Sequence, residues 1–579
     1  MEEPIEFVED IFVEDMIYAL TIRSPIANGS LEGIECPELP DSYYLIKAEH
    51  IPGKNELADF PVTVLADKKL SYIGQPVAIL AGPDELRLEE LASEIDIITD
   101  EEEPLFSGDE NNPGDIVISR SVMSGEPDKF FGECEKIISG TYITGIQEHW
   151  YPESHGAVAV HNNGAFTVHT ATQWPFHVRD SVAGLLGWEN NKVQINPTCV
   201  SHPLDGKIWY PSLIACHAIL AAWVTRRSVK LMLTREEDYM YSPKRNQAEI
   251  TIHSALGDKG EILGSSIQAA LDLGAENVFG DEIMDHTCLG TLGIYNHHSF
   301  RINGAGLRTN IPAQGPLAGF GLAQGFFAAE RHISHIADSM NQDPAEWRKR
   351  NFIQPDQNPG FNINLKDPIP LAELIDAVAA KSDYYRKWAS YELLRNRGPF
   401  FHPGEALRGI GISAAYQGNG FPAPVDPESF SHSGSGSAVV EIEINPVSLA
   451  PFVRGIWLVV DGGKIESEDR ASRVLRTGIV QALGWACREK IFYKDGKIPQ
   501  NCFRCYDLPS PEQIPRITIE FFRNDAKDPK STGELPFCCV PAAYVQAVSQ
   551  AMDHHFMSIP LRTEDIWEAW KEKQTEHSP

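Results

Sequence analysis

The sequence predicts an α+β protein built from several domains. A chain of 579 residues is longer than one hydrophobic core normally supports. Hydrophobic residues make up 42% of the chain and aromatic residues 9%, which is the composition of a globular protein and excludes a disordered one. Short apolar runs rich in β-branched residues alternate with amphipathic stretches, so both strands and helices are expected.

Residues 1–99 are predicted to form a small α/β domain. Apolar runs at 43–46 and 76–80 have the composition of strands, and the pattern at 84–95 is that of a helix. The next segment, residues 100–135, is acidic and is interrupted by glycine and proline. Such a composition is typical of a linker that crosses the surface.

Residues 136–400 are predicted to form a second, larger unit. The apolar alternation of residues 158–160 and 166–168 flanks Asn162-Asn163-Gly164, and Asn-Gly supplies the positive φ that a hairpin turn needs. Further along, the pattern predicts strands at 229–233 and 249–252 and helices at 178–186, 211–225, 321–338, 344–350 and 371–395.

Residues 401–579 are predicted to form a last unit. Strands are expected at 409–416 and 438–444, and Ser431 to Ser437 between them has the composition of a flexible Gly/Ser tether. Helices are expected at 470–487 and 541–552.

Charge and cysteine content restrict the partners and the compartment. The chain has 81 acidic and 49 basic residues, a net charge of -32, which repels phosphate backbones and anionic lipids. We therefore expect neither nucleic acid nor a membrane surface as a partner. The N-terminus has neither a basic nor an apolar signal region, and ten scattered cysteines suit a reducing compartment. A cytoplasmic protein is predicted.

Two segments have residue types that bind metals. Gln147 to His155 contains His149, Glu153 and His155, the donor types of a zinc hydrolase, but Pro152 interrupts a helix that would align them. Cys502, Cys505 and the pair Cys538-Cys539 are either ligands of zinc or an iron–sulfur cluster or ordinary buried thiols. No metal ligand is assigned from these patterns.

Three junctions between a strand and a helix, together with one loop near the C-terminus, are candidate ligand sites. The junctions contain Gln173, residues 201–207 and residues 310–324, and free N–H groups at such junctions point toward ligands. Glu534 follows Gly533 ahead of a predicted helix. A loop glutamate is usually a solvated surface residue, but in a dry pocket it can act as a general base.

These segments, in this order, resemble the molybdopterin-binding large subunit of the xanthine dehydrogenase and aldehyde oxidase family. Residues 22–25 and 72–78 are similar to its N-terminal "hammerhead" domain. Other similar strings follow throughout the chain, at residues 140–142, 147–153, 171–173, 234–238, 343–351 and 479–485. The resemblance implies a hammerhead-like α/β domain followed by molybdopterin-binding-type α+β domains, the last one truncated.

The resemblance also implies roles for individual residues. In the family, a molybdenum centre on a pterin dithiolene hydroxylates a carbon centre with oxygen derived from water. Glu534 matches the glutamate that deprotonates the attacking hydroxyl, and Gln173 matches the glutamine that reaches the metal's oxygen ligand. Gly206, Phe320 and Gly321 match positions of the family's cofactor-binding loops.

Several positions differ from the family pattern. The glycine-rich loop is replaced by Ser201 to Gly206, with Asp205 adding negative charge, and Ala318 replaces an arginine. A segment of the order of one domain is missing after Gly420. The resemblance therefore leaves two alternatives, a molybdenum hydroxylase subunit or a cofactor-free structural or assembly partner.

The resemblance implies partners as well. Flavin and iron–sulfur subunits are expected, or a second chain with a molybdopterin domain, because this chain has no FAD or iron–sulfur motif of its own. An oligomeric assembly is therefore predicted.

Overall fold

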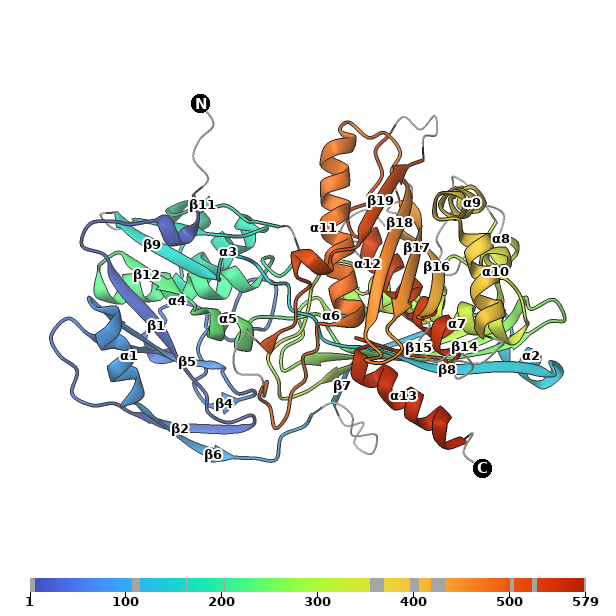
Figure 1. The fold of residues 1–579 in the computed structure, drawn as a ribbon. Coiled ribbons are helices and arrows are strands. Elements are labelled where there is room, and N and C mark those ends of the chain that lie inside the picture. Colours follow the sequence, from blue (N-terminus) through green and yellow to red (C-terminus); the bar gives the residue numbers. More distant parts are fainter. Residues whose placement is uncertain are drawn as a thin grey trace.

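The fold is taken from a computed structural model that describes residues 6–106, 115–162, 165–202, 204–354, 369–395, 406–417, 433–499, 505–522 and 528–576. Within these residues the chain forms sheets of seven, six, four and three strands, with helices packed on them. Figure 1 shows the seven-stranded sheet at one end of the molecule and the four-stranded sheet at the other. The predicted α+β fold class is confirmed.

The seven-stranded sheet combines strands from distant parts of the sequence. Its order is β11-β10-β9-β12-β1-β5-β3. The strands are β1 (Ile17–Arg23), β3 (Tyr44–Lys47), β5 (Pro76–Gly82), β9 (Gly156–Asn162), β10 (Ala165–Thr170), β11 (Val193–Pro197) and β12 (Val229–Met232). Strands of the predicted 1–99 unit therefore share a sheet with strands of the predicted 136–400 unit.

Two helices pack together beside this sheet. α3 (Pro175–Leu186) and α4 (Tyr210–Thr225) contact each other and strands of the sheet. α4 is apolar on all sides and nearly all of its residues are buried, which is the pattern of a helix enclosed by protein. The strand–helix junctions before α3 and α4 contain Gln173 and Asp205.

A small sheet lies beside the N-terminal strands. It consists of β2 (Gly29–Glu35), β4 (Lys69–Leu70) and β6 (Asp96–Glu101). α1 (Glu85–Ser93) begins after Asp84, whose side chain accepts a hydrogen bond from the Arg87 N–H, as N-cap residues commonly do.

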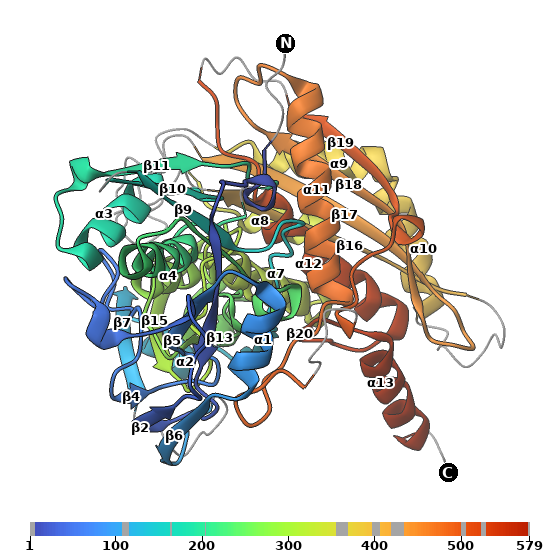
Figure 2. The same cartoon turned by 90° about the vertical axis from the view of Figure 1, so that its left-hand side faces the viewer.

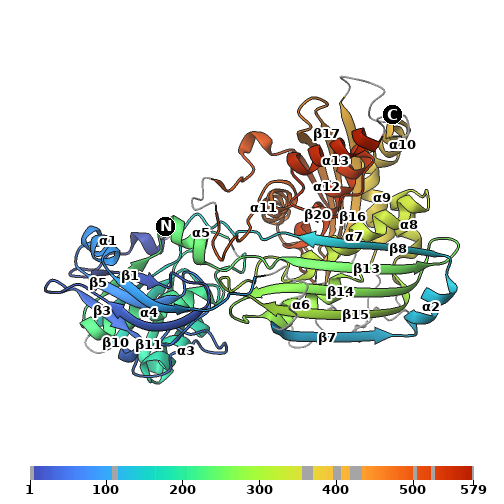
Figure 3. The same ribbon diagram turned by 90° about the horizontal axis from the view of Figure 1, so that it is seen from below.

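The six-stranded sheet includes part of the segment 100–135, which was predicted to be a linker. Its order is β20-β8-β13-β14-β15-β7, and Figure 3 shows it from below with β7 at one edge. β7 (Ile116–Ser124) and α2 (Pro127–Glu133) lie inside the segment predicted to be a linker, because β7 pairs with β15 along its length. The other members are β8 (Lys136–Thr144), β13 (Ala248–Leu256), β14 (Ile262–Gly274), β15 (His297–Arg308) and β20 (Ser558–Ile559).

Helices connect the six-stranded sheet to the rest of the chain. α6 (Gly280–Gly290) and α7 (Leu322–Ser339) contact each other and the sheet, and α8 (Pro344–Asn351) follows α7. α5 (Arg235–Tyr241) begins with a Thr234 capping box just after the seven-stranded sheet.

The four-stranded sheet includes residues that were predicted to form a flexible Gly/Ser tether. β16 (Leu407–Gln417) pairs with β17 (Gly434–Ile444), and the register continues to the pair Gln417 and Gly434. Residues 434–437 are therefore strand. A Cβ on Gly434 would lie 1.9 Å from the Ser531 carbonyl oxygen, so glycine is needed here for close backbone approach and not for flexibility.

Helices cover both faces of this sheet, which is completed by β18 (Pro451–Asp461) and β19 (Arg516–Phe521). Figure 2 shows α11 (Glu468–Cys487) and α12 (Leu535–Met552) on one side and α9 (Leu371–Ser382) and α10 (Tyr384–Arg395) on the other. The single helix predicted at 371–395 is two helices, because Asp383 between them has φ 58°. α12 begins six residues earlier than predicted, directly after Glu534.

The remaining predicted strands and helices are present with small shifts of their ends. α13 (Thr563–Glu576) closes the described chain. Asn163-Gly164, Pro203, Gly418 to His432 and Cys502 lie outside the described residues. Among the helices that the structure describes, none is long and apolar enough to cross a bilayer.

Candidate functional site

Glu534 lies at the N-terminus of α12, where the side chain of Gln417 holds it. The Glu534 N–H donates to Gln417 Oε1 at 2.8 Å, and Gln417 Nε2 donates to Glu534 Oε2 at 3.2 Å. The backbone N–H of Gly319 also donates to the carboxylate. Since Gln417 ends β16 and α12 packs on β16, strand and helix together fix the position of this carboxyl group.

Gln173 holds Asp205 in the same way. Gln173 Nε2 donates to Asp205 Oδ1 at 3.3 Å, and the Asp205 N–H donates to Gln173 Oε1 at 3.1 Å. The Tyr151 hydroxyl donates to the same amide oxygen at 3.4 Å, and the Gln173 N–H donates to the Lys207 carbonyl at 2.8 Å. Both the oxygen and the nitrogen of the Gln173 amide are therefore hydrogen-bonded to neighbouring protein groups.

The carboxyl groups of Asp205 and Glu534 are hydrogen-bonded to each other. Asp205 has φ 70°, a left-handed conformation that favours glycine and costs free energy for other residues. This unusual backbone brings the Asp205 side chain between Gln173 and Glu534. The two predicted site residues thus come together only through Asp205.

One proton is shared by this pair. Burial raises the pKa of Asp205 well above its ordinary range, and the neighbouring Glu534 carboxylate raises it further. Burial also raises the pKa of Glu534, against the opposing effects of the Gly319 N–H, the hydrogen bond from Asp205 and the charge of Arg245. Because the pKa is raised further at Asp205 than at Glu534, Asp205 is the partner that keeps the proton and donates it to Glu534 when the pair holds a single proton.

Arg245 supplies the balancing positive charge. It is 1% exposed, and its guanidinium lies 4.3 Å from the Trp485 ring centroid and 5.0 Å from that of Phe537. Nε donates to Gln147 Oε1 at 3.1 Å, whereas Nη1 and Nη2 have no hydrogen-bond partner among the described residues. Burial lowers the pKa of Arg245 to about 10, so it remains charged at neutral pH.

The other predicted cofactor-binding residues, Gly206, Phe320 and Gly321, lie in closely packed loops. A Cβ on Gly206 would lie 2.1 Å from His149 Cδ2, so Gly206 allows the loop to pack closely on that ring. Phe320 has φ 43° and its ring lies 5.7 Å from that of Phe279. A Cβ on Gly321 would lie 2.2 Å from the Ile283 carbonyl oxygen. These residues shape the loops around the carboxyl pair.

The possible zinc ligands are paired with other groups. His149 Nδ1 lies 2.8 Å from Glu148 Oε1, His155 Nδ1 lies 2.7 Å from Asp238 Oδ1, and Glu153 forms an ion pair with Lys207 at 3.2 Å. In the part of the chain that the structure describes, no cluster of three or more His, Cys, Asp or Glu could hold a metal ion.

A cavity of about 150 Å³ is lined by Leu204, the residue before Asp205, among others. Leu204, Leu317 and Phe537 line it together with Gln481 and Glu489. Burial raises the pKa of Glu489 to about 7, although hydrogen bonds from Tyr506 and Gln147 act in the opposite direction.

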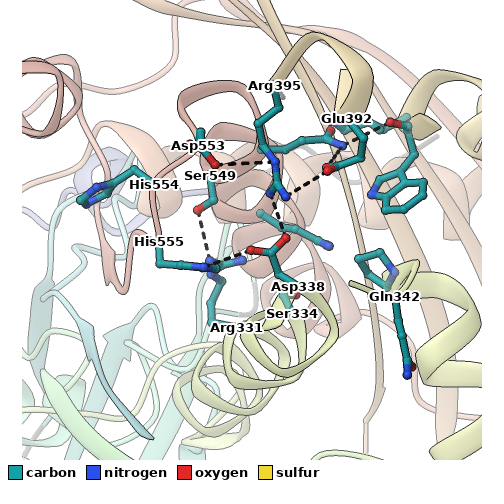
Figure 4. A pocket seen from close by; sticks show the side chains of 15 residues that line it. Arg331, Ser334, Asp338, Gln342, Glu392, Arg395, Ser549, Asp553, His554 and His555 are labelled. Atoms are coloured by element: carbon teal, nitrogen blue, oxygen red, sulfur yellow. Dashed lines mark hydrogen bonds and ion pairs between the residues drawn. The ribbon is translucent and has the colours of Figure 1, made fainter. Parts of the chain in front are cut away.

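Figure 4 shows a second pocket, of about 90 Å³, where α7, α10 and the end of α12 meet. Asp338 contacts Arg395 at 2.9 Å and His555 at 3.1 Å. Arg331 Nη2 donates to Ser549 Oγ at 3.1 Å, and the Gln550 amide donates to Glu392 at 2.7 Å. Arg395 and His555 both bind Asp338, and Arg331 donates to Ser549 and to the Phe556 carbonyl, so the pocket is a polar junction between three helices.

Sequence comparison identifies the family. Residues 109–352 and 414–515 each match a model described as a molybdopterin cofactor-binding domain. The chain is 26% identical over 394 residues to the nicotinate dehydrogenase large molybdopterin subunit of Eubacterium barkeri, covering 65% of this chain and 92% of that protein. The chain belongs to the xanthine dehydrogenase and aldehyde oxidase family of molybdenum hydroxylases.

Other members of this family are longer than the matched region. A subunit of the probable xanthine dehydrogenase of Bacillus subtilis (strain 168) is 24% identical, with 66% of this chain and 53% of that protein covered. Aldehyde oxidase 1 of Oryctolagus cuniculus is 26% identical, and the match covers 70% of this chain and 32% of that protein. The chain thus spans about half and about a third of these two relatives.

Solved structures show the same fold. Quinoline 2-oxidoreductase from Pseudomonas putida 86 superposes with a TM-score of 0.86 at 17% identity, covering 98% of this chain and 96% of that chain. Aldehyde oxidoreductase from Desulfovibrio gigas superposes with a TM-score of 0.85 at 17% identity, and the match covers 98% of this chain and 79% of that chain.

The residues around Glu534 do not fit the family's molybdenum centre. By the resemblance, Gln173 and Glu534 would face the oxygen ligands of the metal, yet here the Asp205 carboxyl group lies between them and bonds to both. The backbone of Gly206, expected to approach a cofactor, instead packs on His149. The chemistry available at this site is that of a carboxyl pair which holds one proton between two glutamine amides.

The sequence alone found part of this arrangement. Glu534, Gln173 and the extra charge of Asp205 were visible as motif matches and as a departure from the family pattern. Gln417 and Arg245 were missed as site residues. Gln417 could have been found as the residue directly after its predicted strand, whereas no sequence signal separates Arg245 from a surface arginine.

Proposed function

We propose that this chain is a cytoplasmic partner subunit of a molybdenum hydroxylase and does not hold the molybdenum cofactor itself. The observation that carries the proposal is the Asp205 carboxyl group, which fills the space between Gln173 and Glu534. A metal centre at this point would require Asp205 to give up both hydrogen bonds and would add a carboxylate beside an anionic cofactor.

A second candidate function follows from Glu534. It is a half-buried residue whose carboxyl group has a raised pKa, and a base of this kind could accept a proton from a substrate or a metal-bound group. The family's molybdenum centre, when present, supplies the hydroxyl group to be deprotonated. On this hypothesis the chain is the catalytic subunit itself, and Asp205 must move away when the cofactor binds.

Metal analysis separates the two functions. The protein is produced in a host that synthesises molybdopterin, purified with its natural partners, and analysed for molybdenum and for pterin fluorescence after oxidation. We expect far less than one molybdenum per chain in correctly folded protein. Stoichiometric molybdenum would refute the proposal, and loss of turnover in Glu534→Gln with unchanged molybdenum content would then establish the second function.

A matched variant controls for a poorly loading host. Asp205→Gly removes the side chain that fills the site and restores the residue type that its backbone favours. If this variant takes up molybdenum while the parent does not, then Asp205 itself excludes the metal. If the parent takes up as much as the variant, Asp205 does not exclude it.

The proposed partners are flavin and iron–sulfur subunits or a second molybdopterin-domain chain. Two of the relatives are themselves named as subunits, which supports an assembly. The buried cysteines Cys216, Cys288, Cys538 and Cys539 are free thiols, as expected in a reducing compartment. Purification from the native cell, followed by absorption spectroscopy for flavin and iron–sulfur groups, tests this. A chain that elutes alone under mild conditions would contradict the proposed role as a partner.

A further inference from the structure

Asp205 and Glu534 belong to different parts of the molecule. Asp205 lies between β11 and α4 and is held by Gln173, which follows β10 of the same seven-stranded sheet. Glu534 begins α12 and is held by Gln417 of the four-stranded sheet. Figure 1 shows these two sheets at opposite ends of the molecule. Each carboxyl group is therefore fixed within its own part, and the bond between them crosses from one part to the other.

This bond requires a proton. Two ionised carboxylates accept hydrogen bonds but cannot donate one, and they repel each other at contact distance. The glutamine amides do not remove this requirement, because Gln173 Nε2 donates to Asp205 and Gln417 Nε2 donates to Glu534, each within its own part. Loss of the proton therefore breaks the direct bond between the two carboxyl groups. It leaves both glutamine contacts intact, together with the indirect path in which Ala318 N–H donates to the Leu204 carbonyl at 3.2 Å and Gly319 N–H donates to Glu534.

We propose that the Asp205–Glu534 pair is a proton-dependent latch that holds the strand–helix junction of the seven-stranded sheet against the N-terminus of α12. The latch is closed when the pair shares one proton and opens when both carboxyl groups are ionised. This inference rests on the proposed function, because a bound metal centre would occupy the same space.

The surrounding groups determine how the latch responds to pH. Arg245 is the cation that faces both carboxyl groups, and the Gly319 N–H faces Glu534. Tyr151 faces Asp205, and Cys538 faces Glu534. Burial raises the pKa of both Tyr151 and Cys538, so both remain neutral in the range where carboxyl groups titrate. Arg245 and the Gly319 N–H both favour the ionised carboxylates and so oppose the repulsion, and Arg245 is the cation among these groups.

The sign of the pH dependence follows from these shifts. A carboxyl group whose pKa is higher in the closed state binds more protons there than in the open state, so closure is favoured at low pH. The latch is fully closed below the ordinary carboxyl range. It opens as the pH rises through the raised pKa of the pair.

Hydrogen exchange measured by mass spectrometry tests the latch on the full chain. Protection factors, corrected for the intrinsic pH dependence of exchange, are followed for peptides that span 204–210 and 531–540. We expect protection to fall about tenfold as the pH rises, which corresponds to the loss of one charge-assisted hydrogen bond. Protection that does not depend on pH overturns the latch.

Substitutions assign the effect to the pair. In Glu534→Gln an amide N–H can donate to the Asp205 carboxylate without a shared proton, so protection should remain high at every pH. In Arg245→Met the opposing cation is lost, so opening should move to higher pH. Glu276→Gln is the matched control, since burial raises the pKa of Glu276 to about 7 at a different place, and it should keep the parental pH dependence.

The outcomes distinguish the two proposals. A pH dependence that persists in Glu534→Gln overturns the latch, even where the variant folds normally. Molybdenum is measured on the same samples. Stoichiometric metal overturns the proposed function and the latch together, whereas metal-free protein with pH-independent protection overturns the latch alone.

Discussion

Substitutions at Asp205 separate two contributions of this residue to stability, the strain of its backbone and the hydrogen bonds of its side chain. Its backbone has φ 70°, which costs alanine about 1 kcal/mol relative to glycine. Its side chain accepts a hydrogen bond from Gln173 and donates one to Glu534. Two such bonds, one of them to a charged group, contribute about 2–4 kcal/mol. Asp205→Gly should therefore lose both hydrogen bonds but relieve the backbone strain, which lowers the local stability by a net of about 1–3 kcal/mol.

Two further variants complete the series. Asp205→Ala should cost about 1 kcal/mol more than Asp205→Gly, because it loses the same bonds and keeps the strain. Asp205→Asn should lie within about 0.5 kcal/mol of the parent at mildly acidic pH, since asparagine tolerates positive φ and its amide keeps both bonds. At higher pH, Asp205→Asn should become more stable than the parent.

Native-state hydrogen exchange of the peptide 204–210 measures these local free energies, because a multidomain chain does not unfold in one step. The expected order of stability is Asn, then the parent, then Gly, then Ala. Equal values for Gly and Ala would show that the left-handed backbone stores no strain. A Gly variant as stable as the parent would show that the Asp205 carboxyl group contributes nothing to the site.

Two other substitutions give independent tests by thermal unfolding. Gly206→Ala should destabilise the fold by about 1–3 kcal/mol, because its Cβ would lie 2.1 Å from His149 Cδ2, whereas Gly33→Ala has nothing within 4 Å and should melt like the parent. Asp338→Asn should flatten the acid limb of the stability profile. Burial opposes the effect, but the hydrogen bond from His555 helps lower the pKa of Asp338 to about 2, so its contribution is present above the ordinary pKa and is lost as the pH falls toward 2. An unchanged acid limb would contradict this.

Much of the fold could be predicted from local pattern. The Asn-Gly hairpin strands, the helix after Asp343 and the apolar run of α4 were clear because each has a strong periodic or turn signal. Local composition misled at Gly434 to Ser437, which is strand because Gly434 packs on the Ser531 backbone. It also misled at residues 116–133, where pairing with β15 overrides an acidic, loop-like sequence.

The site was predictable only in part. Glu534 and Gln173 were found through motifs, but the contact that joins them depends on the positive φ of Asp205, and on three-dimensional proximity between loops far apart in sequence. Neither can be read from spacing. Arg245 is a site residue only because Trp485 and Phe537 enclose it, and these come from the last third of the chain.

The seven-stranded sheet combines strands from distant parts of the sequence, and this limits where the chain can be divided into separate units. β1 lies between β12 and β5, so deleting the first hundred residues would not remove a detachable module. It would remove three strands from the sheet and leave β12 as an edge strand with unpaired backbone groups, and such an edge is prone to aggregation.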